Sequence, residues 1–296
     1  MRINNNLMIS HWRRDYAGIQ NRLDRTLHQV STGRKFTVPS DDPVRMSQSI
    51  RTQTDLFELE QYQKNIGDAR SWMEASDSAM QSISQILQRV RELAVYGGNG
   101  TLPQESRDAV AMEVDSLLQE LVNIGNTNLG GRYIFSGRQT KQMPYAYDPL
   151  IPGYVYQGDS GSLRYEIGKG VTIEISMPGG SLFNDGTVNL LDAIMNMSAA
   201  LKTPGGDPTA YLDQIDRGID NLLRWESELG ARLKRIELAE SRSGEISQYL
   251  TQIDSEQVDI DLAEVVTQLK MQESVQQAAL AVGARIIQPS LVEFLR

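Results

Sequence analysis

The sequence predicts a mainly α-helical protein with a small β-rich insertion, an elongated antiparallel coiled coil or helical bundle. Two observations carry this prediction. Apolar residues recur at alternating three- and four-residue steps through most of the chain, as in helices that pack along a narrow seam. Within the central residues 129–189, the runs 163–167 and 171–177 instead alternate apolar and polar side chains with period two, which is typical of strands.

The first predicted helix ends at Ser31-Thr32-Gly33, because glycine suits the left-handed residue that follows a helix. After a break around Pro39, the second helix begins at Asp41-Asp42-Pro43, where aspartate can cap the helix and proline fits its first position. The seam of the first helix consists of Ile9, Trp12, Tyr16, Ile19, Leu23, Thr26 and Val30.

The second helix is expected to reach about Tyr96, followed by a glycine-rich turn and a third helix, which together form an antiparallel hairpin. Thr101 and Gln104 have the spacing of a capping box at the start of the third helix. The expected seam of the second helix is Tyr62, Ile66, Ala69, Met73, Ser76, Met80, Ile83, Leu87, Val90 and Ala94.

Two strands are predicted near the end of the central stretch, over residues 163–167 and 171–177, with a hairpin turn at Gly168-Lys169-Gly170. Helical spacing returns at Leu190, and a long penultimate helix is expected from Thr209. Residues 254–261 are acidic and less periodic, so we expect a joint there. A last helix follows, which Pro289 ends or kinks, with a final turn over residues 291–295.

In the simplest tertiary arrangement, the first helix packs against the last, and the second and third helices pack against the penultimate one. This gives three predicted domains. Residues 1–40 and 255–296 form a terminal coiled-coil arm, residues 41–130 and 190–254 form a helical bundle, and residues 131–189 form an outer β-rich domain.

Charge is unevenly distributed along the chain. The net charge of −9 argues against a nucleic-acid partner. Residues 1–40 nevertheless carry a net charge of +5 and residues 254–296 a net charge of −4, so we expect these two ends to attract one another. The chain has no cysteine, which excludes disulfides and thiol catalysis. No apolar run suggests a cleaved signal peptide or a membrane span.

The sequence offers no set of residues for catalysis, and we expect neither an enzyme, a metal site nor a cofactor. His11 and His28 are seventeen residues apart on one helix, so they cannot share a ligand. The acidic run from Asp254 lacks the glycine and the final glutamate of a calcium-binding loop. Residues 129–189 contain neither histidine nor cysteine, which argues against an enzyme in the β-rich part.

A two-helix arm leaves most of its surface exposed to water, and an isolated helix of this length is only marginally stable in water. Two interpretations stay open: an ordinary intramolecular coiled coil, or an arm that neighbouring copies complete. On the second, the candidate residues for subunit packing are Ile9, Trp12, Ile19, Leu23, Val30, Leu262, Val266, Leu269, Val282 and Ile286.

Several runs of residues resemble the flagellins and hook-associated junction proteins. They are residues 27–35 (LHQVSTGRK), 39–44 (PSDDPV), 130–137 (GGRYIFSG), 259–269 (DIDLAEVVTQL) and 291–296 (LVEFLR). The resemblance covers roughly residues 1–140 and 205–296, and it implies a helical bundle of flagellin type. The stretch 87–93 is similar to a flagellin segment used between subunits, which makes Arg89, Arg91 and Glu92 candidate contacts; a solvated helix face is the alternative.

The resemblance also implies a role and partners. The chain would be a structural subunit that forms an adaptor layer at the hook–filament junction, with its arms in the inner tubular layer that lines the export channel. Its partners would be itself, a companion hook-associated junction protein, flagellin, and an export chaperone of the FlgN kind at the C-terminal helix. It would leave the cell through the flagellar type III exporter without a cleaved signal. The alternatives are a minor flagellin and a cytoplasmic coiled-coil scaffold.

Overall fold

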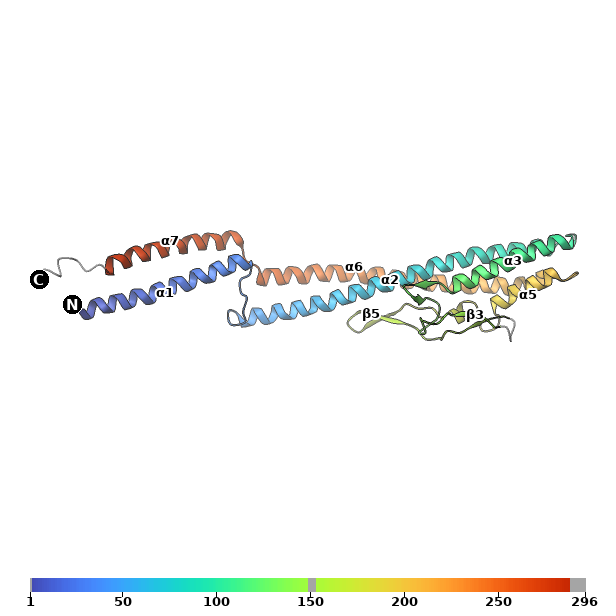
Figure 1. Cartoon of the computed structure of the whole chain (residues 1–296), viewed down its shortest axis with the longest axis horizontal. Coiled ribbons are helices and arrows are strands. Elements are labelled where there is room, and N and C mark those ends of the chain that lie inside the picture. Colours follow the sequence, from blue (N-terminus) through green and yellow to red (C-terminus); the bar gives the residue numbers. More distant parts are fainter. Residues whose placement is uncertain (1, 149–152, 288–296) are drawn as a thin grey trace. The chain divides into compact units, whose positions relative to one another are not determined.

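A computed structural model of the chain describes residues 2–148 and 153–287. The chain divides into two compact units. We call Met1–Glu58 with Ile246–Arg296 the arm unit, and Leu59–Glu245 the core unit. The chain passes between them along two long helices, α2 (Pro43–Gly97) and α6 (Leu212–Val258), each of which contributes residues to both units (Figure 1).

The arm unit pairs the first helix with the last. Helix α1 (Arg2–Thr32) and helix α7 (Leu262–Ile287) lie side by side and antiparallel, as the sequence predicts (Figure 1). Helix α1 ends where expected, because Gly33 adopts a φ of 70°, which glycine tolerates best. Helix α2 begins at Pro43, and the Asp42 carboxylate accepts a hydrogen bond from the Arg45 backbone N–H at 3.0 Å.

The two segments that connect the arm helices to α2 and α6 are hydrogen-bonded to each other. The backbone N–H of Lys35 donates to the Val258 carbonyl at 2.7 Å, and that of Ile260 donates to the Gly33 carbonyl at 3.1 Å. Phe36 and Val258 are buried at this junction. The joint is shorter than predicted, since α6 remains helical to Val258 and the break is confined to residues 259–261.

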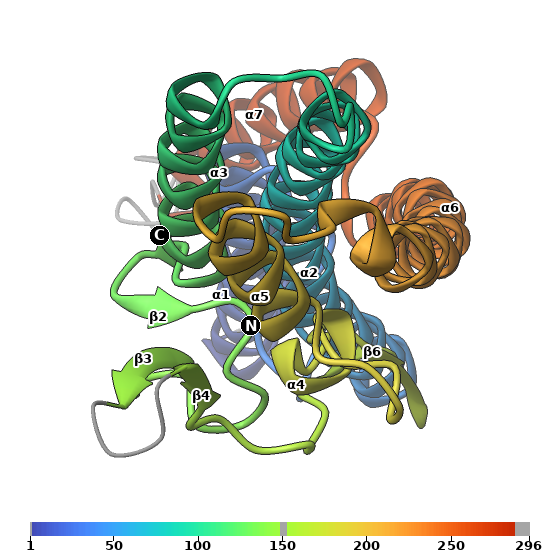
Figure 2. The same cartoon turned by 90° about the vertical axis from the view of Figure 1, so that its right-hand side faces the viewer.

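The core unit is built around the predicted seam of α2. It adds helix α3 (Gln104–Gly125), helix α5 (Leu190–Lys202) and the N-terminal part of α6, which surround α2 in the end-on view (Figure 2). Nine of the ten predicted seam residues are buried, which confirms the periodicity: Ile66, Ala69, Met73, Ser76, Met80, Ile83, Leu87, Val90 and Ala94.

The start of helix α3 differs from the prediction. Pro103 occupies the position before the helix and no side chain caps it. The Thr101 hydroxyl instead donates to the Asn99 side chain at 2.8 Å, within the turn. The capping-box prediction is wrong because the helix begins at Gln104, too late for Thr101 to reach its first free N–H groups.

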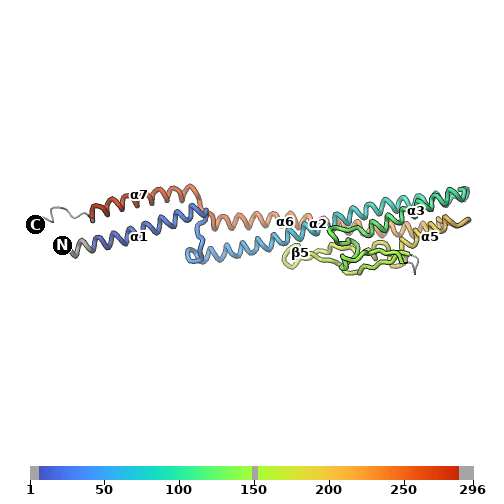
Figure 3. The backbone as a smooth tube through the Cα atoms, in the orientation of Figure 1, coloured from blue at the N-terminus to red at the C-terminus, as the bar shows by residue number. Residues whose placement is uncertain are grey.

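Between α3 and α5 the chain forms three antiparallel strand pairs, traced in Figure 3. The predicted hairpin is confirmed, with a turn at Gly170, whose φ is 73°. The other two pairs, helix α4 (Gly179–Leu182) and the 3-10 turn Pro208–Tyr211 were not predicted. The pairs are β1 (Asn128–Leu129) with β2 (Arg132–Tyr133), β3 (Tyr145–Asp148) with β4 (Gly153–Tyr156), and β5 (Arg164–Gly168) with β6 (Val171–Glu174).

The strand-rich segment shares the hydrophobic core of the helices. Ile134, Phe135, Ile173, Ile175 and Met177 are buried in the same cluster as the seam of α2. Each fully buried side chain of this size stabilises the fold by roughly 1.5–3 kcal/mol. The division into three domains stays a prediction.

Candidate functional site: the terminal arm

The candidate packing residues lie on helices α1 and α7, and the structure separates them into two groups. Eight of the ten are half-buried along the contact between the two helices, so water still reaches part of each side chain. These eight are Ile9, Trp12, Ile19, Leu23, Val30, Val266, Leu269 and Ile286. The arm is therefore a thin two-helix contact whose seam is incompletely covered.

Leu262 and Val282 form the second group. They are 59% and 50% exposed, so they do not belong to the α1–α7 seam. Val282 instead continues an outward face of α7 together with Met271 and Val275, which are 63% and 45% exposed. Steps of four and seven residues place these three side chains on one side of the helix. The arm thus presents an uncovered apolar stripe in addition to its seam.

A tryptophan–glycine contact fixes α1 against α7. The Trp12 indole N–H donates to the Ala279 carbonyl at 3.0 Å, and its ring stacks on Tyr16 with centroids 5.3 Å apart. Gly283 is buried directly beneath the ring, since a Cβ there would lie 2.3 Å from Trp12. Sequence reasoning missed Gly283, although its place four residues after Ala279 is a seam position.

The expected attraction between the two ends does not take the form of ion pairs. Among the described residues, no salt bridge joins α1 to α7. The charged side chains described on α1 lie outside the apolar seam that α7 covers, and the attraction between the two ends stays a prediction. Several arm charges remain available on the surface.

The candidate contacts on α2 are exposed but already paired within the core unit. Arg89 lies 2.8 Å from Glu113 on α3 and 3.0 Å from Glu92, and Arg91 lies 2.6 Å from Asp216 on α6. Hydrogen bonding to Glu113 and Glu92 raises the pKa of Arg89, and hydrogen bonding to Asp216 raises the pKa of Arg91. Their role between subunits stays a prediction.

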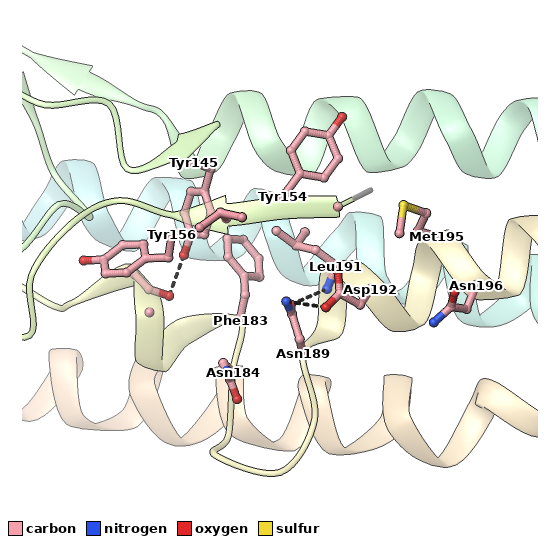
Figure 4. Close-up of a pocket in the computed structure, with 14 residues that line it drawn as sticks. Tyr145, Tyr154, Tyr156, Phe183, Asn184, Asn189, Leu191, Asp192, Met195 and Asn196 are labelled. Atoms are coloured by element: carbon pink, nitrogen blue, oxygen red, sulfur yellow. Dashed lines mark hydrogen bonds between the residues drawn. The ribbon is translucent and has the colours of Figure 1, made fainter. Parts of the chain in front are cut away.

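The core unit also contains an open pocket of about 510 Å³ beside β4 and the start of α5 (Figure 4). Its polar groups serve the fold. The Tyr145 hydroxyl donates to the Gly179 carbonyl, and the Asn189 side chain caps α5 by accepting from the Leu191 N–H at 3.2 Å and donating to Asp192 at 2.7 Å. Burial raises the pKa of Tyr145 well above its usual value. These hydrogen bonds hold β3 against α4 and fix the start of α5, and none of them activates a nucleophile.

His11 and His28 are both exposed on α1. Within residues 2–148 and 153–287, no group of three or more potential ligands could hold a metal ion. In the same part of the chain, no helix combines the length and apolarity that crossing a bilayer requires. The predicted turn after Pro289 and the resemblance over residues 291–296 lie outside the described residues.

Comparison with known proteins agrees with this architecture. Residues 3–140 match the pattern of the bacterial flagellin N-terminal helical region. The flagellar hook-associated protein 3 of Escherichia coli is 28% identical over 304 residues, covering 94% of this chain and 95% of that protein. A flagellin of Bacillus subtilis is 24% identical and covers 96% of both chains.

Solved structures share the fold. A flagellar hook-associated protein from Vibrio parahaemolyticus superposes with a TM-score of 0.69 at 23% identity, covering 74% of this chain and all of that one. The junction protein FlgL of Legionella pneumophila gives a TM-score of 0.61 at 17% identity and covers 73% of this chain.

These matches and the helical architecture identify the chain as a structural protein of the bacterial flagellum, whose residues 3–140 resemble the flagellins. Proteins of this class are part of an extracellular organelle. Among its relatives, the chain resembles hook-associated protein 3, or FlgL, over nearly its full length.

Proposed function

We propose that this protein is an adaptor of the hook–filament junction, which assembles into a layer through its terminal helices. The observation that carries the proposal is the match to hook-associated protein 3 over 94% of the chain, which includes both arm helices. The exposed stripe of Met271, Val275 and Val282 supports it physically, because uncovered apolar faces of this kind are typical of interaction surfaces.

The proposed layer consists of copies of this chain between a companion hook-associated junction protein and the flagellin filament. The half-buried α1–α7 seam and the outward stripe of α7 would be completed by neighbouring copies. Each large apolar side chain that becomes fully covered would contribute roughly 1.5–3 kcal/mol. The protein acts as a structural element and not as an enzyme, and it needs no cofactor.

Export is the second part of the proposal. The chain would travel through the flagellar type III exporter without cleavage, and a chaperone of the FlgN kind would hold the amphipathic C-terminal helix beforehand. The exposed apolar stripe of α7 is a suitable binding surface for such a chaperone, because a groove on the chaperone would shield these side chains from water before the chain joins an assembly.

The decisive experiment compares flagellin released into the medium with flagellin retained as filament, in a strain that lacks this gene. The junction role predicts intact hooks, secreted flagellin and few attached filaments. Normal filaments and motility in that strain would refute the proposal.

Substitution in the seam tests the role of the arm. Ile19→Asp or Leu269→Asp is expected to leave the core unit folded but to abolish filament attachment, because a carboxylate cannot be buried in the assembled arm. Circular dichroism of the purified variants and filament retention in complemented cells measure the two effects. Normal retention by either variant would contradict an arm-based assembly.

The similarity to the Bacillus subtilis flagellin over 96% of both chains keeps a minor flagellin as the second candidate. The deletion strain distinguishes the two. A minor flagellin would leave the remaining filaments attached and would be present along their length, whereas a junction adaptor would be confined to their base.

A further inference from the structure

Helix α1 has a second face that the α1–α7 seam does not use. Residues at steps of three and four, all exposed except the half-buried Gly18, form a line along the helix. We call the two arginines and two histidines of this line, His11, Arg14, Arg25 and His28, the basic stripe; Gly18 and Asn21 complete the line. It holds both histidines of the chain and no acidic residue.

Among the described residues, the arginines of the basic stripe form no ion pair within their own chain. No salt bridge or side-chain hydrogen bond within residues 2–148 and 153–287 involves the side chains of Arg14 or Arg25. This contrasts with α2, where Arg70, Arg89 and Arg91 are each paired with a carboxylate. The contrast matters because unpaired like charges along one helix face repel each other.

The same unit carries the opposite charge at the joint between α6 and α7. We call its exposed carboxylates Glu256, Asp259, Asp261 and Glu264 the acidic patch. Arg34 and Lys35 lie beside the patch but leave it net negative. The Asp261 side chain caps α7 through the Ala263 N–H at 2.9 Å. Among the described residues, the carboxylates of Glu256 and Glu264 accept hydrogen bonds from glutamines on their own helices.

We infer that the basic stripe of one copy docks against the acidic patch of a second copy of this chain. The inference rests on the proposed function and deepens it, because it names the electrostatic contact that would set the order of neighbouring arms. A second copy is the fitting occupant, since the chain itself supplies the complementary surface and no ion pair joins the two surfaces within the described part of one molecule. Because the contact joins two different surfaces, each pair of copies leaves one basic stripe and one acidic patch unoccupied. Further copies can therefore add in the same head-to-tail manner.

The test is a charge exchange in the full-length chain, followed by sedimentation velocity in about 50 mM and about 300 mM salt, where screening differs strongly. The wild-type chain is expected to associate at low salt and less at high salt. Arg14→Glu with Arg25→Glu, and separately Glu256→Lys with Glu264→Lys, are each expected to weaken association at least about tenfold, because like charges then face each other. The second pair spares the Asp261 cap.

Mixing the two reversed variants is the critical measurement. Each then offers the other a complementary pair of surfaces, so association is expected to return to near the wild-type value. Lys141→Glu with Arg235→Glu is the matched control, as it changes the net charge of the chain equally through exposed residues of the core unit. It should associate like the wild type.

Three outcomes would overturn the inference: a wild-type chain that stays monomeric at low salt, reversed variants that associate normally, or a mixture that fails to associate although both variants keep their helix content. None of them affects filament retention in the deletion strain, so the proposed junction role is judged separately.

Discussion

The arm unit and the core unit use the same helical periodicity with opposite results. In the core unit, the seam of α2 is fully enclosed, and Ile83, Leu87 and Val90 have no accessible surface. In the arm unit, the equivalent seam residues Ile19, Leu23 and Leu269 are only half-buried. The difference arises because α2 is covered by several helices and strands, whereas α1 and α7 cover only each other.

This difference indicates where each unit obtains its stability. The core unit closes its hydrophobic cluster within one chain. The arm keeps apolar side chains at its surface and fixes its own register through few contacts, of which Trp12 on Gly283 is the most specific. The exposed apolar side chains of the arm unit can be buried by neighbouring molecules, which is the physical basis of the proposed assembly.

The largest effect is expected in the core unit. Leu87→Ala should lower the free energy of unfolding by about 2–5 kcal/mol, because the cavity would form where no surface is exposed. Leu280→Ala on α7, where the side chain is 47% exposed, should change it by less than about 0.5 kcal/mol. Chemical denaturation of both variants measures the contrast, and equal losses would show that the arm is packed as tightly as the core.

A smaller effect, confined to the arm, is expected from Gly283→Val. Its side chain would collide with Trp12 and should loosen the arm by about 1–3 kcal/mol, as overpacking typically does. Trp12→Ala in the same chain should recover part of that loss. Hydrogen exchange of α1 and α7 in the double-mutant cycle measures the coupling. Additive effects of the two substitutions would contradict a direct contact.

Ion pairs on the core unit should matter less. Arg91→Ala removes the pair with Asp216 and should lower the free energy of unfolding only slightly, since exposed pairs are screened by water. If Arg91 also contacts another subunit, filament retention should fall while the thermal midpoint hardly changes. Unchanged retention would remove Arg91 from the list of contacts between subunits.

The smallest effect concerns pH. Burial, and to a lesser extent the charge of Asp77, raises the pKa of Glu226 on α6. Protonation of the Glu226 carboxyl group therefore stabilises the folded state. Its contribution to stability is therefore present below its ordinary pKa and is lost as the pH rises through the folded-state pKa. Glu226→Gln should raise the thermal midpoint at pH 7 by about 1–2 °C and leave it unchanged near pH 4. An equal shift at both pH values would exclude this cause.

Local signals in the sequence predicted most elements correctly. The run Asp41-Asp42-Pro43 begins α2, and Gly33 ends α1. The alternation around Gly170 gives the β5–β6 hairpin. The hairpin of β3 and β4 escaped prediction because the segment between α3 and β5 lacks strict alternation and its pairing depends on Tyr145, which packs into the helical core.

Faces were harder to predict than elements. Val282 and Gly283 are neighbours, and hydrophobicity favours the valine as the seam residue. The structure places Gly283 in the seam and Val282 at the surface, because the large Trp12 ring occupies that position of the contact and needs a partner without a side chain. A decision of this kind depends on a residue more than two hundred and sixty positions away.

The sequence by itself therefore determined the long helices, the end of α1, the start of α2 and the β5–β6 hairpin, since these follow from periodicity, glycine, proline and caps within a few residues. Only the tertiary structure decided which apolar faces are enclosed, that the strand-rich segment shares the helical core, and that no ion pair joins α1 to α7 among the described residues. The physical reason is that burial and pairing depend on what lies opposite a side chain, which local periodicity does not specify.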